Sequence, residues 1–353
     1  MKALAFGTQQ ICTRLLRTLR TVFSSFVVSL GLLALSLCMS MTVSAQTPTV
    51  LRVNQNAPAS SLNNGSSWAN AFTNLQAAIA AAQPSAQNPV QIWIARGTYY
   101  PTSGTDRTAS FHLKSNLILE GGFNGTETND NQSSVFFNPT VLSGDIGRPQ
   151  RNKLDANNIV LASVPFDPND PGAQDNCYNV VTGNNVVGVV LDNLYITGGY
   201  ANAGNSVVSQ ATLEGMSLPI GPTVQDTSFP APSVMPLDSR VAGGGLCFVE
   251  PDGVLKFAIA LTINNCVFEN NGARGYGGAI ACKWAAVRTG GVVIQNNYAG
   301  EEGGAFWAMN CVAEFEAVSF ETNKCAGAGG ALVYRSCPST YNTDLGNAFT
   351  PFQ

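Results

Sequence analysis

Residues 261–338 read LTINNCVFENNGARGYGGAIACKWAA, then VRTGGVVIQNNYAGEEGGAFWAMNCV, then AEFEAVSFETNKCAGAGGALVYRSCP. The three rows align without a gap, so that Gly277, Gly303 and Gly329 recur at a constant interval, which is the length of one row. A fixed period of about 20–50 residues is typical of a solenoid, in which each unit buries its apolar face only against its neighbours. The sequence therefore predicts a stack of three similar units.

Each unit contains short apolar alternations between Gly- and Asn-rich turns, whereas a helical repeat would place apolar residues three and four apart. Similar residues also recur in columns, as parallel strands on successive coils require. The units therefore predict an all-β fold, a parallel β-helix. The columns are Phe268, Ile294 and Phe320; Asn271, Asn297 and Asn323; and Gly277-Gly278, Gly303-Gly304 and Gly329-Gly330.

The Asn and Gly columns are expected at the corners of each coil. Asn tolerates the left-handed backbone conformation, and stacked amides can hydrogen-bond from coil to coil. We therefore expect Asn271, Asn297 and Asn323 to form a ladder in a turn. The Gly pairs would form the next corner, where a Cβ would restrict the backbone.

Two motifs in these units resemble the FxxN and GGA[ILV] motifs of the chlamydial polymorphic outer-membrane proteins. Phe268-x-x-Asn271 is followed by Gly277-Gly278-Ala279-Ile280, and the third unit repeats the pair from Phe320. The middle unit departs at Ile294 and Phe306, which are still apolar. The resemblance covers residues 242–338, and it implies a right-handed parallel β-helix that is carried on a bacterial surface as an adhesive passenger.

Shorter patterns extend the expected β-helix back to residue 90. They predict a turn at 96–99 and strands at 90–95, 111–113, 116–120, 140–144, 179–183 and 189–197. These coils resemble, more loosely, those of pectin-lyase-like proteins. Pro-rich segments near 148–177 and 200–241 interrupt them, and we expect insertions that either carry recognition or act as spacers.

The first 89 residues are expected to contain an export signal and a cap. Met1–Ala45 combines basic residues, an apolar run and a small-residue cleavage site, which indicates a signal peptide; an uncleaved anchor helix is the alternative. Residues 46–89 are expected to cap the open end of the β-helix with an amphipathic helix. One face of that helix would carry Trp68, Phe72, Leu75, Ile79 and Ala82.

Charged residues make up 11% of the chain. Removal of the signal leaves 14 basic and 22 acidic residues, a net charge near −8, which argues against nucleic acid and anionic membranes as partners. After Pro338 only part of a unit precedes Gln353, so we expect either a fragment of a longer gene product or a released protein.

Signals for catalysis are few. The single histidine, His112, lies in an alternating strand pattern and is interpreted as structural or exposed. Glu269 and Glu321 share a column, separated by Gln295. Two strand spacings would place their backbones about 9.6 Å apart, near the limit of about 9.5 Å for the carboxylates of inverting glycosidases. A solvated face is the favoured interpretation of this column.

One segment could bind calcium through hard oxygen ligands. It contains Asp167, Asn169, Asp170 and Asp175, whose spacing does not match an EF-hand, so a polar turn is favoured. No other cofactor is indicated. Seven cysteines follow the predicted signal, and most of them fall in apolar columns, where Cys packs as a small hydrophobe.

The sequence thus predicts an exported protein of the outer membrane, the cell surface or the extracellular space. We interpret it as an adhesin-like or structural passenger, with a carbohydrate or a cell-surface protein as partner. Attachment to the outer membrane would need an anchor outside this chain. The alternative function is a carbohydrate-active enzyme, a polysaccharide lyase or glycoside hydrolase on the same fold, which would need an acidic cleft.

Overall fold

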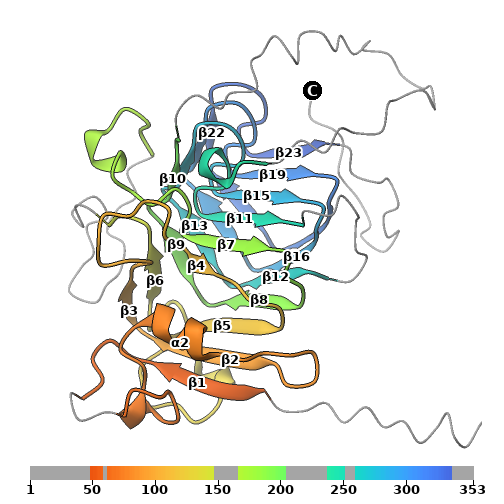
Figure 1. The fold of residues 1–353 in the computed structure, drawn as a ribbon. Coiled ribbons are helices and arrows are strands. Elements are labelled where there is room, and N and C mark those ends of the chain that lie inside the picture. The colour runs from red at the N-terminus through yellow and green to blue at the C-terminus, as the bar shows by residue number, and fades with distance from the viewer. Residues whose placement is uncertain (1–47, 59–61, 147–165, 204–236, 251–258, 336–353) are drawn as a thin grey trace, which may run out of the picture. The chain divides into compact units, whose positions relative to one another are not determined.

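The computed structural model describes residues 48–58, 62–146, 166–203, 237–250 and 259–335. These residues belong to the compact unit 47–353, whereas the predicted signal lies outside the described residues. Four sheets run along this unit, and every strand pair between described residues is parallel. The chain therefore forms a parallel β-helix, whose coils follow one another from orange to blue in Figure 1.

Each sheet is named here after its strand in the first repeat, which runs from β12 to β15. The β12 sheet consists of β1 (Thr49–Val53), β2 (Val90–Ala95), β5 (Leu117–Phe123), β8 (Val189–Asp192), β12 (Leu261–Asn264), β16 (Ala286–Gly290) and β20 (Val312–Glu316). The β13 sheet consists of β3 (Gly97–Tyr99), β6 (Thr140–Ser143), β9 (Tyr195–Thr197), β13 (Val267–Glu269), β17 (Val293–Gln295) and β21 (Ser319–Glu321).

The other two sheets complete each coil. The β14 sheet consists of β10 (Tyr200–Ala201), β14 (Gly272–Ala273), β18 (Tyr298–Ala299) and β22 (Lys324–Cys325). The β15 sheet consists of β4 (Phe111–His112), β7 (Val181–Asn184), β11 (Leu246–Val249), β15 (Ile280–Lys283), β19 (Phe306–Met309) and β23 (Leu332–Arg335). The predicted strands are therefore present, but residues 97–99, which were expected to be a turn, form β3 instead.

The predicted apolar columns form the core. Phe268 pairs with Ile294, which pairs with Phe320, and both Phe268 and Ile294 are fully buried. A second column runs from Ile280 to Phe306 and Leu332. Because each repeat makes one coil, similar side chains stack at the strand spacing, and one continuous core runs along the coils.

The Asn column forms the predicted ladder. The Nδ2 of Asn271 lies 3.1 Å from the Oδ1 of Asn297, and the Nδ2 of Asn297 lies 2.9 Å from the Oδ1 of Asn323. Each Oδ1 also accepts the backbone N–H of the Asn one coil earlier, at 2.9 and 3.1 Å. The side chains therefore join successive coils through buried amides, which a low dielectric strengthens.

The left-handed residue of this corner is one position earlier than the sequence indicated. Positive φ angles belong to Asn270, Asn296 and Thr322, between 52° and 57°, and not to the ladder residues. The reason is geometric, because a ladder side chain must point into the coil while the residue before it reverses the backbone. The Gly corner is as predicted: Gly277, Gly303 and Gly329 have φ of 61°, 64° and 69°.

The N-terminal region differs from the predicted cap. Residues 49–53 pair with β2, so that the β12 sheet begins inside the segment 46–89. The predicted helix is divided into a 3-10 turn, η1 (Trp68–Asn70), and α2 (Leu75–Ala81). The side chain of Asn74 caps α2 by accepting the N–H of Ala77, and Phe72 is used in a bridge to Val53. Among the described residues, no helix has the length and apolarity needed to cross a membrane.

The described ends of both predicted insertions pack on the coils. The ring of Phe166 lies 4.9 Å from that of Tyr200 and 6.3 Å from that of Tyr298, over Gly272 of β14. A Cβ at Gly272 would lie 2.3 Å from this ring, so the glycine provides the space for it. The second insertion ends in a 3-10 turn, η4 (Ser239–Val241). The rest of both insertions, 147–165 and 204–236, lies outside the described residues.

Candidate functional site

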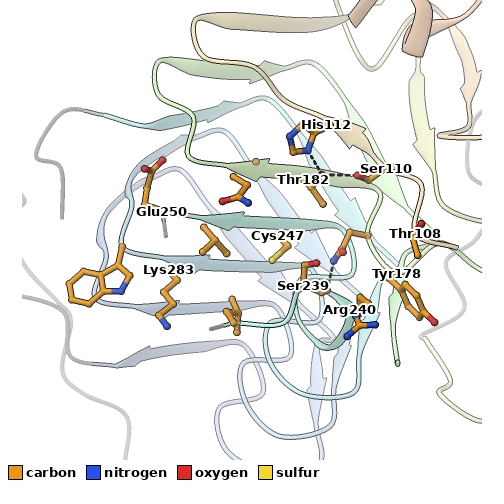
Figure 2. A pocket seen from close by; sticks show the side chains of 16 residues that line it. Thr108, Ser110, His112, Tyr178, Thr182, Ser239, Arg240, Cys247, Glu250 and Lys283 are labelled. Carbon is orange, nitrogen blue, oxygen red and sulfur yellow. Dashed lines mark hydrogen bonds between the residues drawn. The ribbon is translucent and has the colours of Figure 1, made fainter. Parts of the chain in front are cut away.

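A groove of about 570 Å³ lies on the outer face of the β15 sheet. Its lining comes from β4, β7, β11, β15, η4 and the segments beside them, and Figure 2 shows the side chains. The lining residues are Thr108, Ser110, His112, Tyr178, Asn179, Thr182, Gly183, Asn184, Leu237, Ser239, Arg240, Cys247, Val249, Glu250, Lys283 and Trp284.

Strand alternation determines which side chains reach this groove. Leu246 and Phe248 of β11 are in the core, so Cys247 and Val249 between and after them face outward. In β15 the same alternation buries Ile280 and Cys282 and directs Lys283 into the groove. Outward positions of successive coils therefore form the floor.

Three side chains form a polar chain at one end of the floor. The hydroxyls of Ser110 and Thr182 are 2.6 Å apart, and the Nδ1 of His112 lies 3.1 Å from the Thr182 hydroxyl. Figure 2 shows His112, Thr182 and Ser110 joined in this order. His112 is exposed, in agreement with its sequence interpretation, but its place in a groove was not predicted because Thr182 is distant in the sequence.

The charges of the groove are balanced. The Arg240 guanidinium, on the wall, pairs with Asp238 at 2.9 Å. Lys283, which is 4% exposed, and the buried Glu250 supply one charge of each sign. Burial lowers the pKa of the Lys283 ammonium. The groove therefore presents polar groups without a strong net charge of either sign.

The wall formed by η4 is fixed to the coils. The side chain of Asp238 accepts the N–H of Arg240 and thereby caps η4. The Nδ2 of Asn179 lies 2.9 Å from the carbonyl oxygens of Ser239 and Ala242 and 2.7 Å from that of Gly243. These hydrogen bonds hold η4 in place beside the floor of the groove.

The predicted carboxylate column has the expected register, and it lies outside the lining of the groove. Glu269 pairs with Gln295, which pairs with Glu321. Glu269 is 4% exposed, with the Nδ2 of Asn296 at 3.5 Å from its carboxylate. Glu321 is exposed and accepts a hydrogen bond from Ser319 of its own strand. The two carboxylates therefore lie in different environments, and neither lines the groove.

Two of the four candidate calcium ligands, Asp167 and Asp170, accept hydrogen bonds within turns. The Asp167 side chain accepts the N–H of Asn169 at 2.9 Å, and the Asp170 side chain accepts that of Gly172 at 2.7 Å, at the start of η3 (Pro171–Ala173). Asp175 lies near Arg107 instead, where its charge favours the protonated guanidinium although burial lowers the pKa of Arg107. Within the described part of the chain, no three His, Cys, Asp or Glu side chains form a group that could hold a metal ion.

Most cysteines of the described residues are buried. Burial raises the pKa of Cys177 and of Cys247 to about 12, so these thiols are protonated and act as small apolar groups. Cys337, which follows Cys311 by one repeat in the sequence, lies outside the described residues.

A carboxylate that the sequence analysis missed lies on the outer face of the β12 sheet. Glu120 is 5% exposed and accepts hydrogen bonds from Gln91 and, at 2.7 Å, from Ser133. It pairs in register with Trp93 and with Asp192. Burial, with a further contribution from Asp192, raises the pKa of Glu120 to about 7. In the sequence, only the alternation of residues in β5 could have indicated that Glu120 points outward.

This carboxylate predicts a pH dependence of stability. The pKa of Glu120 is higher in the folded chain than its ordinary value of 4.5, so the folded chain favours the protonated carboxyl. The contribution of Glu120 to the stability of the folded chain is therefore complete below about pH 4.5, and it is lost as the pH rises through 7. We expect Glu120→Gln to be about 1–3 kcal/mol more stable than wild type at pH 8, relative to their difference at pH 4.

Urea unfolding at the two pH values measures this effect. The amide keeps the size of the carboxyl and can still accept from Ser133. The exposed Glu321→Gln is the matched control and should retain the wild-type pH profile. Parallel profiles for Glu120→Gln and wild type would contradict the assignment.

Known proteins that are similar to this chain include one family of repeats and, among solved structures, two carbohydrate-active proteins. The family model described as the Chlamydia polymorphic membrane protein repeat matches residues 265–283. A pectin methylesterase in complex with a hexasaccharide is 14% identical with a TM-score of 0.32, over 83% of this chain and 68% of that chain. A glycosyl hydrolase candidate from Parabacteroides merdae ATCC 43184 is 13% identical with a TM-score of 0.23, over 75% of this chain and 88% of that chain.

No curated protein matches the chain. The TM-scores of the two solved structures are too low to indicate an activity for this chain. The matched residues 265–283 include Phe268, Asn271 and Gly277–Ile280, the positions that build the ladder corner, the Gly corner and the core column. In its repeat the chain is therefore similar to the Chlamydia polymorphic membrane proteins, and this repeat forms coils of a parallel β-helix.

Proposed function

We propose that this chain is an exported β-helix protein of the bacterial cell surface or the extracellular space, an adhesin-like or structural passenger that binds surface polymers or the surfaces of other cells. The observation that carries the proposal is the repeat at residues 265–283, whose family is described as a membrane protein of Chlamydia. The export signal expected at Met1–Ala45 supports the same location.

The geometry supports binding more than catalysis. Stacked coils give a rigid scaffold, and the groove on the β15 sheet offers both hydrogen-bonding groups and apolar surface. In contrast, the buried Glu269 and the exposed Glu321 do not face a common cleft. A glycosidase needs two carboxylates on either side of one bond.

The proposal is tested with the full chain produced in a bacterial host with an outer membrane. We expect surface display or secretion, measured by protease treatment of intact cells and by analysis of the medium, together with increased attachment of these cells to surfaces. A chain without residues 1–45 is the control for export. Retention of the full chain in the cytoplasm would contradict the proposal.

The enzyme alternative is tested by Glu269→Gln combined with Glu321→Gln. We expect folding, display and attachment to remain unchanged, because each amide keeps the size of its carboxyl and can accept the hydrogen bonds seen here. The measurement is release of reducing ends or unsaturated products from polysaccharides by both proteins. An activity in wild type that the double variant lacks would establish the enzyme.

A further inference from the structure

The corner after β15 holds a residue that folding alone does not favour. Trp284 has a φ of 59°, in the left-handed region. The same corner holds Asn185, with a φ of 55°, after β7 and Asn310, with a φ of 54°, after β19. Each of the three backbone N–H groups donates to the next coil, at 3.1 Å for Asn185, 3.0 Å for Trp284 and 2.9 Å for Asn310. Asn tolerates this conformation, whereas a bulky residue is disfavoured in it.

The indole of Trp284 carries a second cost. Its Nε1 is buried and donates to none of the described residues. A buried donor without an acceptor destabilises the fold. The side chain is only partly buried, and it lines the groove. Two unfavourable features thus coincide at one residue of the candidate site, which is the pattern expected where a residue is retained for binding.

The rest of the groove indicates the chemistry of the ligand. Ser110, Thr182 and His112 offer groups that can both donate and accept hydrogen bonds. Lys283 and Glu250 add a charge of each sign, so the groove favours neither cations nor anions. Vicinal sugar hydroxyls are donors and acceptors at once, and a sugar ring also offers C–H groups for the face of an aromatic ring.

Two other ligand classes fit less well. An extended peptide binds by adding a strand to a sheet edge, but β7, β11 and β15 are paired on both sides, and only β4 among the strands that line the groove lies at an edge. Nucleic acid needs a strongly basic surface, whereas the chain after its predicted signal has a net charge near −8 from 14 basic and 22 acidic residues.

We propose that the groove on the β15 sheet binds a neutral polysaccharide, with one sugar ring stacked on Trp284 and hydroxyls bonded along the Ser110–Thr182–His112 chain. This inference rests on the proposed function, for which it names the class of surface polymer.

The experiment uses the purified protein, soluble neutral polysaccharides (β-glucan, galactan, mannan and arabinan) and two anionic ones, polygalacturonate and alginate. Binding is measured by calorimetry and by intrinsic tryptophan fluorescence. We expect wild type to bind at least one neutral polysaccharide, with weaker or no binding of the anionic ones, and a fluorescence change on binding.

The decisive variant is Trp284→Asn, which places at this corner the residue found at Asn185 and Asn310. We expect an unfolding midpoint equal to or above that of wild type and a loss of affinity of about tenfold or more. Trp284→Phe keeps an aromatic ring with a smaller face, and it should bind with intermediate affinity. Glu321→Gln, outside the groove, should bind like wild type.

The inference would be overturned by no binding of any neutral polysaccharide, by stronger binding of the anionic ones, or by a Trp284→Asn variant that binds like wild type. A destabilised Trp284→Asn would also overturn it, because the indole would then serve the fold.

A failure of the polysaccharide inference can be distinguished from a failure of the proposed function. Displayed protein that mediates attachment without binding these polysaccharides would leave only the proposed function standing, whereas binding by a protein that is not exported would leave only the groove assignment.

Discussion

Gly278→Ala is expected to destabilise the β-helix by at least about 3 kcal/mol. A Cβ on Gly278 would lie 2.3 Å from the carbonyl oxygens of both Gly304 and Tyr298. These contacts are with the backbone of the next coil, which cannot move without breaking the bond from the Gly278 N–H to the Gly303 oxygen at 3.1 Å. Overpacking of a core costs about 1–3 kcal/mol when side chains can adjust, and more is expected against backbone.

Gly290→Ala is the matched control for this prediction. Gly290 lies in β16, paired on both sides, and a Cβ there would meet only the Asn264 side-chain oxygen, at 3.4 Å. Glycine loses more backbone freedom on folding than alanine does. Gly290→Ala should therefore leave the free energy of unfolding unchanged or raise it by up to about 1 kcal/mol. Urea unfolding of both variants gives the comparison. Similar midpoints for Gly278→Ala and Gly290→Ala would show that the Gly corner does not hold the coils at this separation.

The sequence predicts the repeat region well because the period determines the register. Once each repeat makes one coil, Phe268, Ile294 and Phe320 must share a column, and the structure pairs them. The same argument predicts the Asn ladder and the Gly corner. Periodicity does not indicate which residue of a corner is left-handed, because Asn270 and Asn271 are both asparagine and only the backbone path distinguishes them.

The groove was not predicted because its residues come from separate coils and from an insertion. Ser110, Thr182 and Lys283 can be assigned to one groove only when the strand register is known, and Arg240 lines the same groove from η4. The coils before residue 261 lack the constant period of the repeats, so the sequence gives no register for them. A signal was nevertheless present in Trp284, since a tryptophan at a corner position that holds Asn310 one repeat later interrupts the column.

Glu120 shows a similar limit. Its neighbours Trp93 and Asp192 belong to the preceding and following coils and are distant in the sequence, and the hydroxyl of Ser133 comes from the segment between β5 and β6. The constant period indicates the column of Glu269, Gln295 and Glu321, but it cannot indicate a buried carboxylate in coils of irregular length. Burial, which determines its pKa, is visible only in the folded chain.

Asn297→Ala is expected to destabilise the chain by about 3–4 kcal/mol, because Asn297 is the central rung of the ladder. Its Nδ2 lies 3.0 Å from the Phe268 oxygen and 2.8 Å from the Gln295 oxygen, and its Oδ1 accepts the Asn271 N–H at 2.9 Å. Alanine would leave these buried backbone groups without partners, at about 1–3 kcal/mol for each group that water cannot reach. Asn297 is 1% exposed, so little water enters without opening the corner.

The form of the loss distinguishes a ladder from simple packing. Asn297→Asp keeps the shape and the acceptor but has no donor for the Phe268 and Gln295 oxygens, so it should also be destabilised by several kcal/mol at neutral pH. Gln295→Ala, two residues earlier on the partly exposed face, should change stability by less than about 1 kcal/mol. Urea midpoints for Asn297→Ala equal to those of wild type would mean that the stacked amides do not join the coils. An Asn297→Asp variant as stable as wild type would show that the donors contribute nothing and that only side-chain volume matters at this corner.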